Sequence, residues 1–317
     1  MKPFRLPILA AGILCVAALS APAAYSEDTD RKIAAFGDDT WALRVPDADG
    51  ISFQGQANRD GAGGGTAQIM YPAPNMAGFI AALVTHGLIN ESSKTAERQR
   101  IQDQANRILE PYAEILSTLS YRALIEHASG KIDKASSPEL IGSADSSSRT
   151  WIMEVTPLYV MTPDQRAIIL DNTVRVFVNG SKNPSYARVI RVVSPPLAET
   201  SEEAIIKAWK DDDGARIRGA SSDLLAESLK IALFDVRSTQ TADERHRTFR
   251  YREGGFERIE RAQLVSEQCD RQVLRTLRGW LLSIPSPHPT TCVAPTPKVE
   301  VAVSNESGDT MNSSDKE

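Results

Sequence analysis

The sequence predicts an α/β (α+β) protein with a mixed or antiparallel sheet and packed helices, between a signal peptide and a disordered C-terminal tail. Two observations predict this fold class. Segments rich in β-branched and aromatic residues occur between residues 150 and 194 and again between 246 and 285. Helix formers with apolar residues at helical spacing precede and separate these segments. We therefore expect one α/β domain over residues 68–284.

Residues 1–26 have the pattern of a signal peptide. Lys2 and Arg5 precede an apolar stretch over 6–19, and small residues suited to signal peptidase follow. The stretch is shorter than the roughly 20 residues that a membrane-spanning helix needs. Leu14 stands where a lipoprotein signal needs a small residue before its cysteine, Cys15, so lipid attachment is not expected. We expect a periplasmic or secreted protein whose signal peptide is cleaved.

An irregular arm is expected over residues 27–67. Pro46, Gly50 and several aspartates favour turns and at most a short strand. The arm includes the glycine-rich run 61–65, which lacks the Lys-Ser/Thr pair of a phosphate-binding loop. We interpret this run as a hinge.

Residues 76–89 are nearly all apolar or small, and Asn75 is a suitable N-cap, so the pattern predicts a helix. A helix that is apolar all round must be covered, and this one is too short to span a bilayer. Three coverings stay open: the protein's own sheet, a membrane surface, or a partner, including a second copy. Phe79, Ile80 and Leu83 are the candidate residues for membrane or partner contact.

A further helical region is predicted between residues 91 and 128, and Pro111 should kink or split it. Residues 129–149 have no persistent pattern and are expected to form a polar loop. Two more helices are predicted from Thr200 and from Ser221, with the "DDDG" sequence between them expected to be a turn.

Strand patterns are found in two parts of the chain. In the first part, three strands are predicted over 150–160, 166–178 and 186–194, with a hairpin connection between the last two. In the second part, a hairpin turning at Gly254-Gly255 is followed by a single strand over 271–285. Beyond residue 285, closely spaced prolines and small polar residues predict a disordered tail.

The stretch 237–278 carries ten arginines against seven acidic residues, in a chain whose formal net charge is −5. Arginine makes bidentate contacts with carboxylates and phosphates, so these residues are candidates for binding an anionic partner. The candidates are Arg250, Arg252, Arg275 and Arg278. The alternative is a solvated face whose arginines pair with glutamates across strands. The acidic balance of the whole chain disfavours nucleic acid as a partner.

Cysteine usage leaves one question open. After removal of the signal peptide the chain keeps Cys269 and Cys292, which in an oxidising compartment either form a disulfide or remain free thiols.

No catalytic pattern is recognisable. The G-x-S-x-G, H-E-x-x-H and Cys-x-x-Cys motifs are absent, and the four histidines lie far apart in the sequence. We therefore assign no catalytic, cofactor-binding or metal-binding residue, and we expect a non-enzymatic protein rather than an enzyme.

Three functions fit these observations. The first is an exported protein that binds or scaffolds an envelope protein or an anionic component of the bacterial cell envelope. The second is a hydrolase whose site the sequence does not reveal. The third is a peripheral membrane protein anchored by residues 76–89, and self-association through this segment also stays open. In layout the chain is similar to small accessory proteins of envelope assembly, a likeness that supplies no functional residue.

Overall fold

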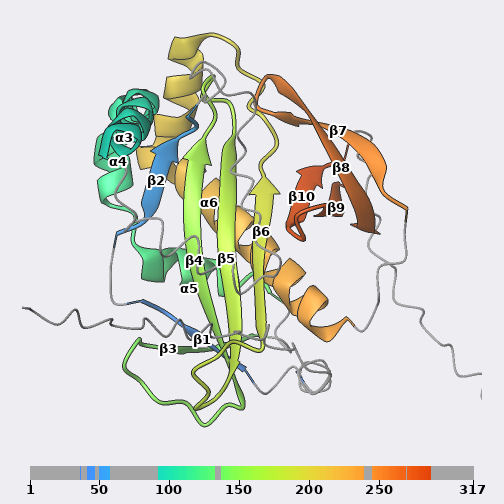
Figure 1. Cartoon of the computed structure of the whole chain (residues 1–317). Helices are drawn as coiled ribbons and strands as arrows, with labels where there is room; N and C mark the ends of the chain where they lie inside the picture. Colours follow the sequence, from blue (N-terminus) through green and yellow to red (C-terminus); the bar gives the residue numbers. More distant parts are fainter. Residues whose placement is uncertain are drawn as a thin grey trace, which may run out of the picture.

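Ten strands of this protein form one mixed sheet, and helices cover one of its faces (Figure 1). The computed structural model describes residues 36, 41–46, 50–57, 92–132, 137–238, 245–268 and 270–286. The predicted α/β fold class with a mixed sheet is confirmed.

The strand order is β3-β1-β4-β5-β6-β10-β9-β8-β7, and β2 also pairs with β4. The strands span β1 (Trp41–Arg44), β2 (Ser52–Gly55), β3 (Glu139–Ile141), β4 (Trp151–Met161), β5 (Ile168–Val178), β6 (Tyr186–Val193), β7 (Arg247–Glu253), β8 (Phe256–Glu267), β9 (Arg271–Thr276) and β10 (Leu281–Pro285). The pairs β1–β3, β1–β4, β2–β4 and β6–β10 are parallel, and the other neighbours are antiparallel.

The centre of the sheet is formed by β4, β5 and β6, where the sequence predicted three strands. Alternation in β5 places Ile168, Leu170 and Val174 on the face that packs against the helices, as expected from their period of two. On the opposite face of the same strand lie Ile169 and Asp171. Each central strand therefore contributes side chains to two different environments.

The helical region before the central strands is split near Pro111, as predicted. Its elements are α3 (Ser92–Asn106), the 3₁₀ helix η1 (Arg107–Tyr112), α4 (Ala113–Ser117) and α5 (Tyr121–Ser129). Proline lacks the N–H group that would continue an α-helical ladder, and Pro111 lies within η1.

The long helix α6 (Glu202–Arg237) packs on β5, β6 and α5. The predicted turn at Asp211–Gly214 is present as a break with non-helical backbone angles. The second helical part resumes directly after Gly214, earlier than the start predicted at Ser221. Gly214 has a φ of 76°, and a side chain there would collide with Ile115 of α4, so the break lets these two segments approach closely.

Three features of the sheet differ from the sequence expectation. The N-terminal arm contributes both β1 and β2, where at most one strand was expected, and β3 lies inside the predicted loop 129–149. The single strand predicted over 271–285 is wrong, because the chain reverses between β9 and β10 at Gly279, whose φ is 78°. Pairing with neighbouring strands stabilises segments as short as β1 and β3, and this information is not local.

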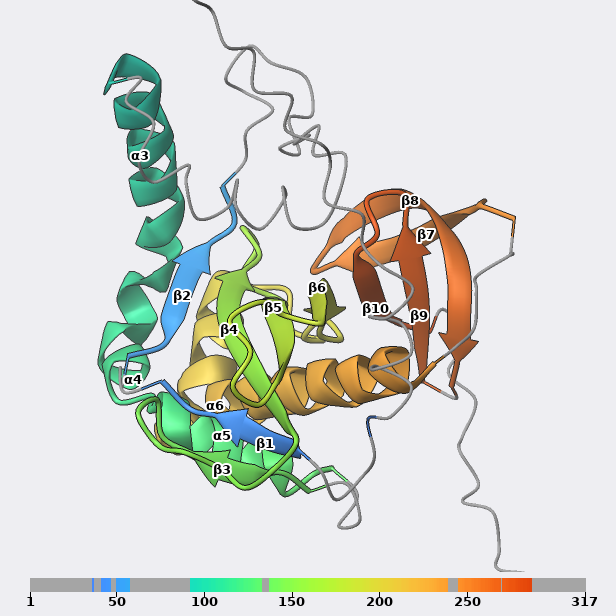
Figure 2. The ribbon, with the colours of Figure 1, turned by 60° about the horizontal axis from the view of Figure 1, so that its bottom comes forward.

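The sheet has an apolar core on each face. The larger core lies between the sheet and the helices and includes Trp41, Tyr159 and Trp209, all nearly inaccessible to solvent. The smaller core lies on the opposite face, where β7 and β8 follow β9 in a curved group of strands beside β4, β5 and β6 (Figure 2). The buried residues of this second core are Val160, Ile169, Val193, Ala262, Leu274, Leu282 and Ile284.

Candidate functional site

The arginine-rich strands β7 and β8 form a hairpin, here called the β7–β8 hairpin. Glu253 pairs with Phe256 across the two-residue turn Gly254-Gly255, which confirms the predicted turn. Gly254 has a φ of 62°, a conformation that glycine adopts without the steric cost of a side chain.

Strand alternation gives the hairpin two faces with different surroundings. The inner face is directed toward the smaller core and carries Phe249, Tyr251, Glu253, Phe256, Arg258, Glu260 and Ala262, with the exposed Arg247 at the end away from the turn. The outer face carries Thr248, Arg250, Arg252, Glu257, Ile259 and Arg261. Because both faces contain arginines, the question is which of them already have partners.

On the inner face, the carboxylate of Glu253 is the centre of a buried polar cluster. Its side chain is only 3% exposed. Its Oε2 atom accepts hydrogen bonds from Arg258 Nε at 2.9 Å and from Gln56 Nε2 at 3.0 Å. Its Oε1 atom accepts a hydrogen bond from the Tyr251 hydroxyl at 3.2 Å. Both oxygens of this carboxylate therefore have hydrogen-bond donors within the protein.

Arg191 of β6 links this cluster to the central strands. Its guanidinium donates to both carboxylate oxygens of Asp171 on β5, each at 2.6 Å, and its Nη1 atom lies 3.8 Å from Glu253 Oε1. The same guanidinium lies 5.6 Å from the ring centre of Trp280. Its anion-binding capacity is therefore used within the protein, and the cluster ties the hairpin to the sheet.

Burial and charge shift the pKa values of this cluster in consistent directions. Burial raises the pKa of the Tyr251 hydroxyl, and the neighbouring Glu253 raises it further. Burial lowers the pKa of Arg191, but Asp171 and Glu253 raise it more, so the guanidinium stays charged. Burial also raises the pKa of Glu260, against the opposing effect of Arg278 and Arg191. Neither Tyr251 nor Arg191 is thus prepared to exchange a proton near neutral pH.

The turn of the hairpin is also attached to the sheet. Gly255 N donates to Asp164 Oδ2 at 2.6 Å, and Asp164 lies in the connection between β4 and β5. Thr162 Oγ1 donates to the other carboxylate oxygen of Asp164 at 2.6 Å. Asp164 therefore holds the hairpin turn against the connection between β4 and β5.

The outer face has a different charge balance. Arg250 Nη1 lies 2.6 Å from Glu257 Oε1, in a pair whose side chains are 67% and 56% exposed. Arg252 and Arg261 are exposed and have no acidic partner among the residues that the structure describes. Ile259, which lies opposite Arg250, is 58% exposed. The outer face thus presents three arginines, one glutamate and an exposed aliphatic side chain.

The four arginines selected from the sequence are divided between different environments. Arg250 and Arg252 lie together on the outer face. Arg275 lies on β9 and donates from Nη2 to Asp235 Oδ1 of α6 at 2.8 Å, so it holds the end of α6. Arg278 lies in the turn between β9 and β10, close enough to Glu260 to lower its pKa.

Two outer-face residues were not selected from the sequence, although the sequence contained the signal for them. Arg261 and Ile259 share the parity of Glu257 along β8, so they follow once the hairpin register is known. The polar cluster on the inner face gave no such signal, because Asp171, Arg191 and Gln56 come from three distant parts of the chain.

The described histidines do not form an enclosed site. His127 is exposed on α5, and His246 is exposed just before β7. Within the described ranges no group of three or more His, Cys, Asp or Glu side chains is arranged to hold a metal ion. Among the same residues no helix is long and apolar enough to cross a membrane.

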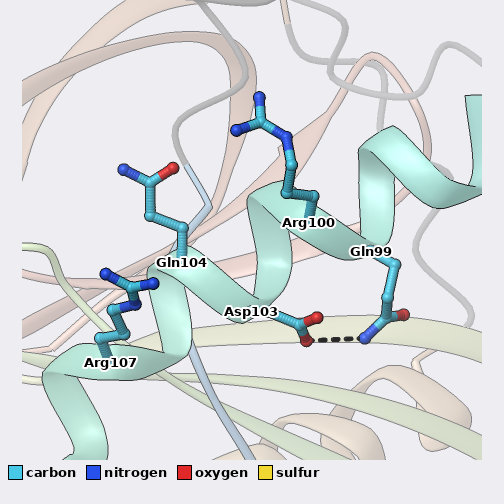
Figure 3. A pocket seen from close by; sticks show the side chains of 5 residues that line it. All are labelled: Gln99, Arg100, Asp103, Gln104 and Arg107. Carbon is cyan, nitrogen blue, oxygen red and sulfur yellow. Dashed lines mark hydrogen bonds between the residues drawn. The ribbon is translucent and has the colours of Figure 1, made fainter.

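The side chains that line a pocket on α3 do not point toward a common point. Its lining residues are Gln99, Arg100, Asp103, Gln104 and Arg107. All five come from one helical segment, and their side chains point in different directions, while Gln99 Nε2 donates to Asp103 Oδ1 at 2.8 Å (Figure 3). The lining is confined to α3 and the first residue of the adjoining η1, so no element from a distant part of the chain contributes to this pocket.

Several predictions lie outside the described residues. These are the signal peptide, the glycine-rich hinge, the apolar helix with Phe79, Ile80 and Leu83, the cysteines Cys269 and Cys292, and the C-terminal tail. They stay predictions.

No protein-family model, curated protein or solved structure matches this chain.

Proposed function

We propose that this is an exported, non-enzymatic protein that binds an anionic component of the cell envelope through the outer face of the β7–β8 hairpin. The observation that carries the proposal is the contrast in partners. Arg252 and Arg261 are exposed without an acidic partner in the described part of the chain, whereas Arg258 is held by the buried carboxylate of Glu253 and Arg191 by the partly buried Asp171.

Charge and shape support the choice of this face. Guanidinium groups recognise carboxylates, phosphates and sulfates in a bidentate manner. The formal charge of the whole chain is −5, so an anionic partner is repelled by the average surface and attracted only where basic residues gather. Ile259 adds exposed apolar area next to these charges, as is common in binding surfaces.

The test is retention of the full chain on immobilised dextran sulfate, a synthetic polyanion. The variants Arg252→Glu and Arg261→Glu should each elute at clearly lower salt than the wild type, because surface attraction of this kind is screened by ions. The matched control is Arg122→Glu, which makes the same charge change on the exposed surface of α5.

The proposal requires the control to elute with the wild type. Equal losses in all three variants would show that net charge alone governs retention. No retention of the wild type at low salt would also overturn the proposed function.

A further inference from the structure

The strand β7 is the last strand of the sheet. It pairs with β8 on one side, and within the described part of the chain nothing pairs with its other side. An edge strand presents unpaired N–H and C=O groups to any extended segment that can lie beside it. The arrangement of these groups along β7 follows from the hairpin turn.

The backbone groups of Thr248, Arg250 and Arg252 are directed to the free edge. In a hairpin closed by a two-residue turn, the two residues that flank the turn exchange hydrogen bonds, here Glu253 and Phe256. Hydrogen-bonded and non-hydrogen-bonded pairs then alternate along an antiparallel ladder. The residues of β7 at non-hydrogen-bonded positions therefore point their N–H and C=O groups away from β8.

The side chains along this edge alternate in the same register. Arg250 and Arg252 lie on the outer face and are exposed. Phe249 and Tyr251 lie on the inner face, where they are half-buried and pack against the smaller core. A strand added at this edge would place alternate side chains beside the arginines and the others beside the two aromatic rings.

We infer that β7 receives an extended protein segment in which acidic and apolar residues alternate, paired as an additional strand of the sheet. This inference rests on the proposed function and names the partner class for the same face. A second copy of β7 is disfavoured as the occupant, because it would set arginines beside arginines. The exposed ion pair between Arg250 and Glu257 is weak enough to exchange its partner for an incoming carboxylate.

The test is fluorescence anisotropy with a labelled peptide of the length of β7, in which glutamate and valine alternate. A first control peptide has the same composition with its glutamates adjacent. A second control peptide carries N-methyl groups on all its backbone nitrogens, which removes strand pairing from both of its edges and keeps the charge. We expect the alternating peptide to bind the full chain about tenfold more tightly than either control, a difference of about 1.4 kcal/mol.

Protein variants locate the binding on the edge. Arg252→Glu should weaken binding of the alternating peptide by about tenfold, equivalent to about 1.4 kcal/mol, while Arg122→Glu leaves the affinity unchanged. Thr248→Pro removes an N–H group from the free edge without changing an arginine. This variant should also bind the alternating peptide more weakly.

The outcomes separate this inference from the proposed function. Equal binding of all three peptides, together with dextran sulfate retention that depends on Arg252, would leave anion binding intact and overturn strand addition. If the three peptides bound equally and vesicles of anionic phospholipid bound more tightly than any peptide, a lipid surface would be the partner. That outcome would also overturn strand addition. Binding of none of these probes would mean that the arginines only protect an edge from pairing, and both proposals would then be wrong.

Discussion

The inner and outer faces of the β7–β8 hairpin use the same residue type in opposite ways. On the inner face, Arg258 meets the buried carboxylate of Glu253, and Arg191 of the adjacent strand β6 lies between Glu253 and Asp171, so these contacts tie the hairpin to the sheet. On the outer face, Arg252 and Arg261 face solvent without an acidic partner in the described part of the chain. Burial of the counter-charge, rather than the arginine itself, decides whether the residue is tied into the fold or stays exposed to solvent.

Buried and exposed ion pairs contribute differently to the free energy of unfolding. An ion pair between exposed side chains contributes about 0 to 1 kcal/mol, whereas removing one member of a buried pair leaves an uncompensated charge and costs several times more. Substitutions on the inner face should therefore change the free energy of unfolding, and substitutions on the outer face should leave it nearly unchanged.

The largest effect is expected for Glu253→Gln on the inner face. The variant leaves Arg258 and Gln56 without their carboxylate, so we expect a loss of about 3 kcal/mol in the free energy of unfolding. The matched control is Glu257→Gln on the outer face of the same hairpin, which should cost at most about 1 kcal/mol. Urea unfolding measures both, and similar losses in the two variants would remove the distinction between the faces.

The attachment of the turn should give the next largest effect. Gly254→Ala forces an alanine into a positive φ and places a methyl group against the Asp164 carboxylate, so we expect a loss of at least about 2 kcal/mol. Gly180 also has a positive φ, 83°, but open space around it, so Gly180→Ala should cost only about 1 kcal/mol. Thermal unfolding compares the two, and equal costs would mean that the turn is not held by Asp164.

The smallest effect is a pH dependence at Glu260. Burial raises the pKa of this carboxyl in the folded state above its ordinary value of 4.5. The folded protein therefore holds this proton more tightly than the unfolded chain, and that contribution is lost as the pH rises through the folded-state pKa. Glu260→Gln should gain stability relative to the wild type as the pH rises above about 4.5. Urea unfolding across this range should show the difference widening with pH, and a constant difference contradicts the assignment.

The sequence was sufficient for the parts of the fold that depend on local pattern. Apolar periodicity located β4, β5, β6 and both parts of α6, and the Gly254-Gly255 pair located the hairpin turn. It failed for β3 and for one of the two strands of the N-terminal arm, which are too short to carry a pattern; β4 supplies the partner edge for β1, and β1 supplies it for β3. The sequence-based prediction also joined β9 and β10 into one strand, because Gly279 is the only recognisable turn residue between them.

The candidate site was only partly predictable for a related reason. The arginine surplus pointed to the strands on which the proposed site lies, and Arg250 and Arg252 lie together on the outer face. Arg275 could not be separated from them, because its partner Asp235 comes from α6. Whether an arginine is paired depends on residues that the fold brings close to it. The sequence of a single strand carries no information about those residues.

The most direct test of the account compares Arg258→Gln with Arg261→Gln, two variants of β8 whose side chains lie on opposite faces of the hairpin. Each purified variant is measured both by urea unfolding and by retention on dextran sulfate. The account predicts a crossed result. Arg258→Gln should lose about 1.5 kcal/mol of stability and keep its retention, whereas Arg261→Gln should stay within about 0.5 kcal/mol of the wild type and lose retention. Parallel changes in both measurements for both variants would contradict the division of the hairpin into a stabilising and a binding face.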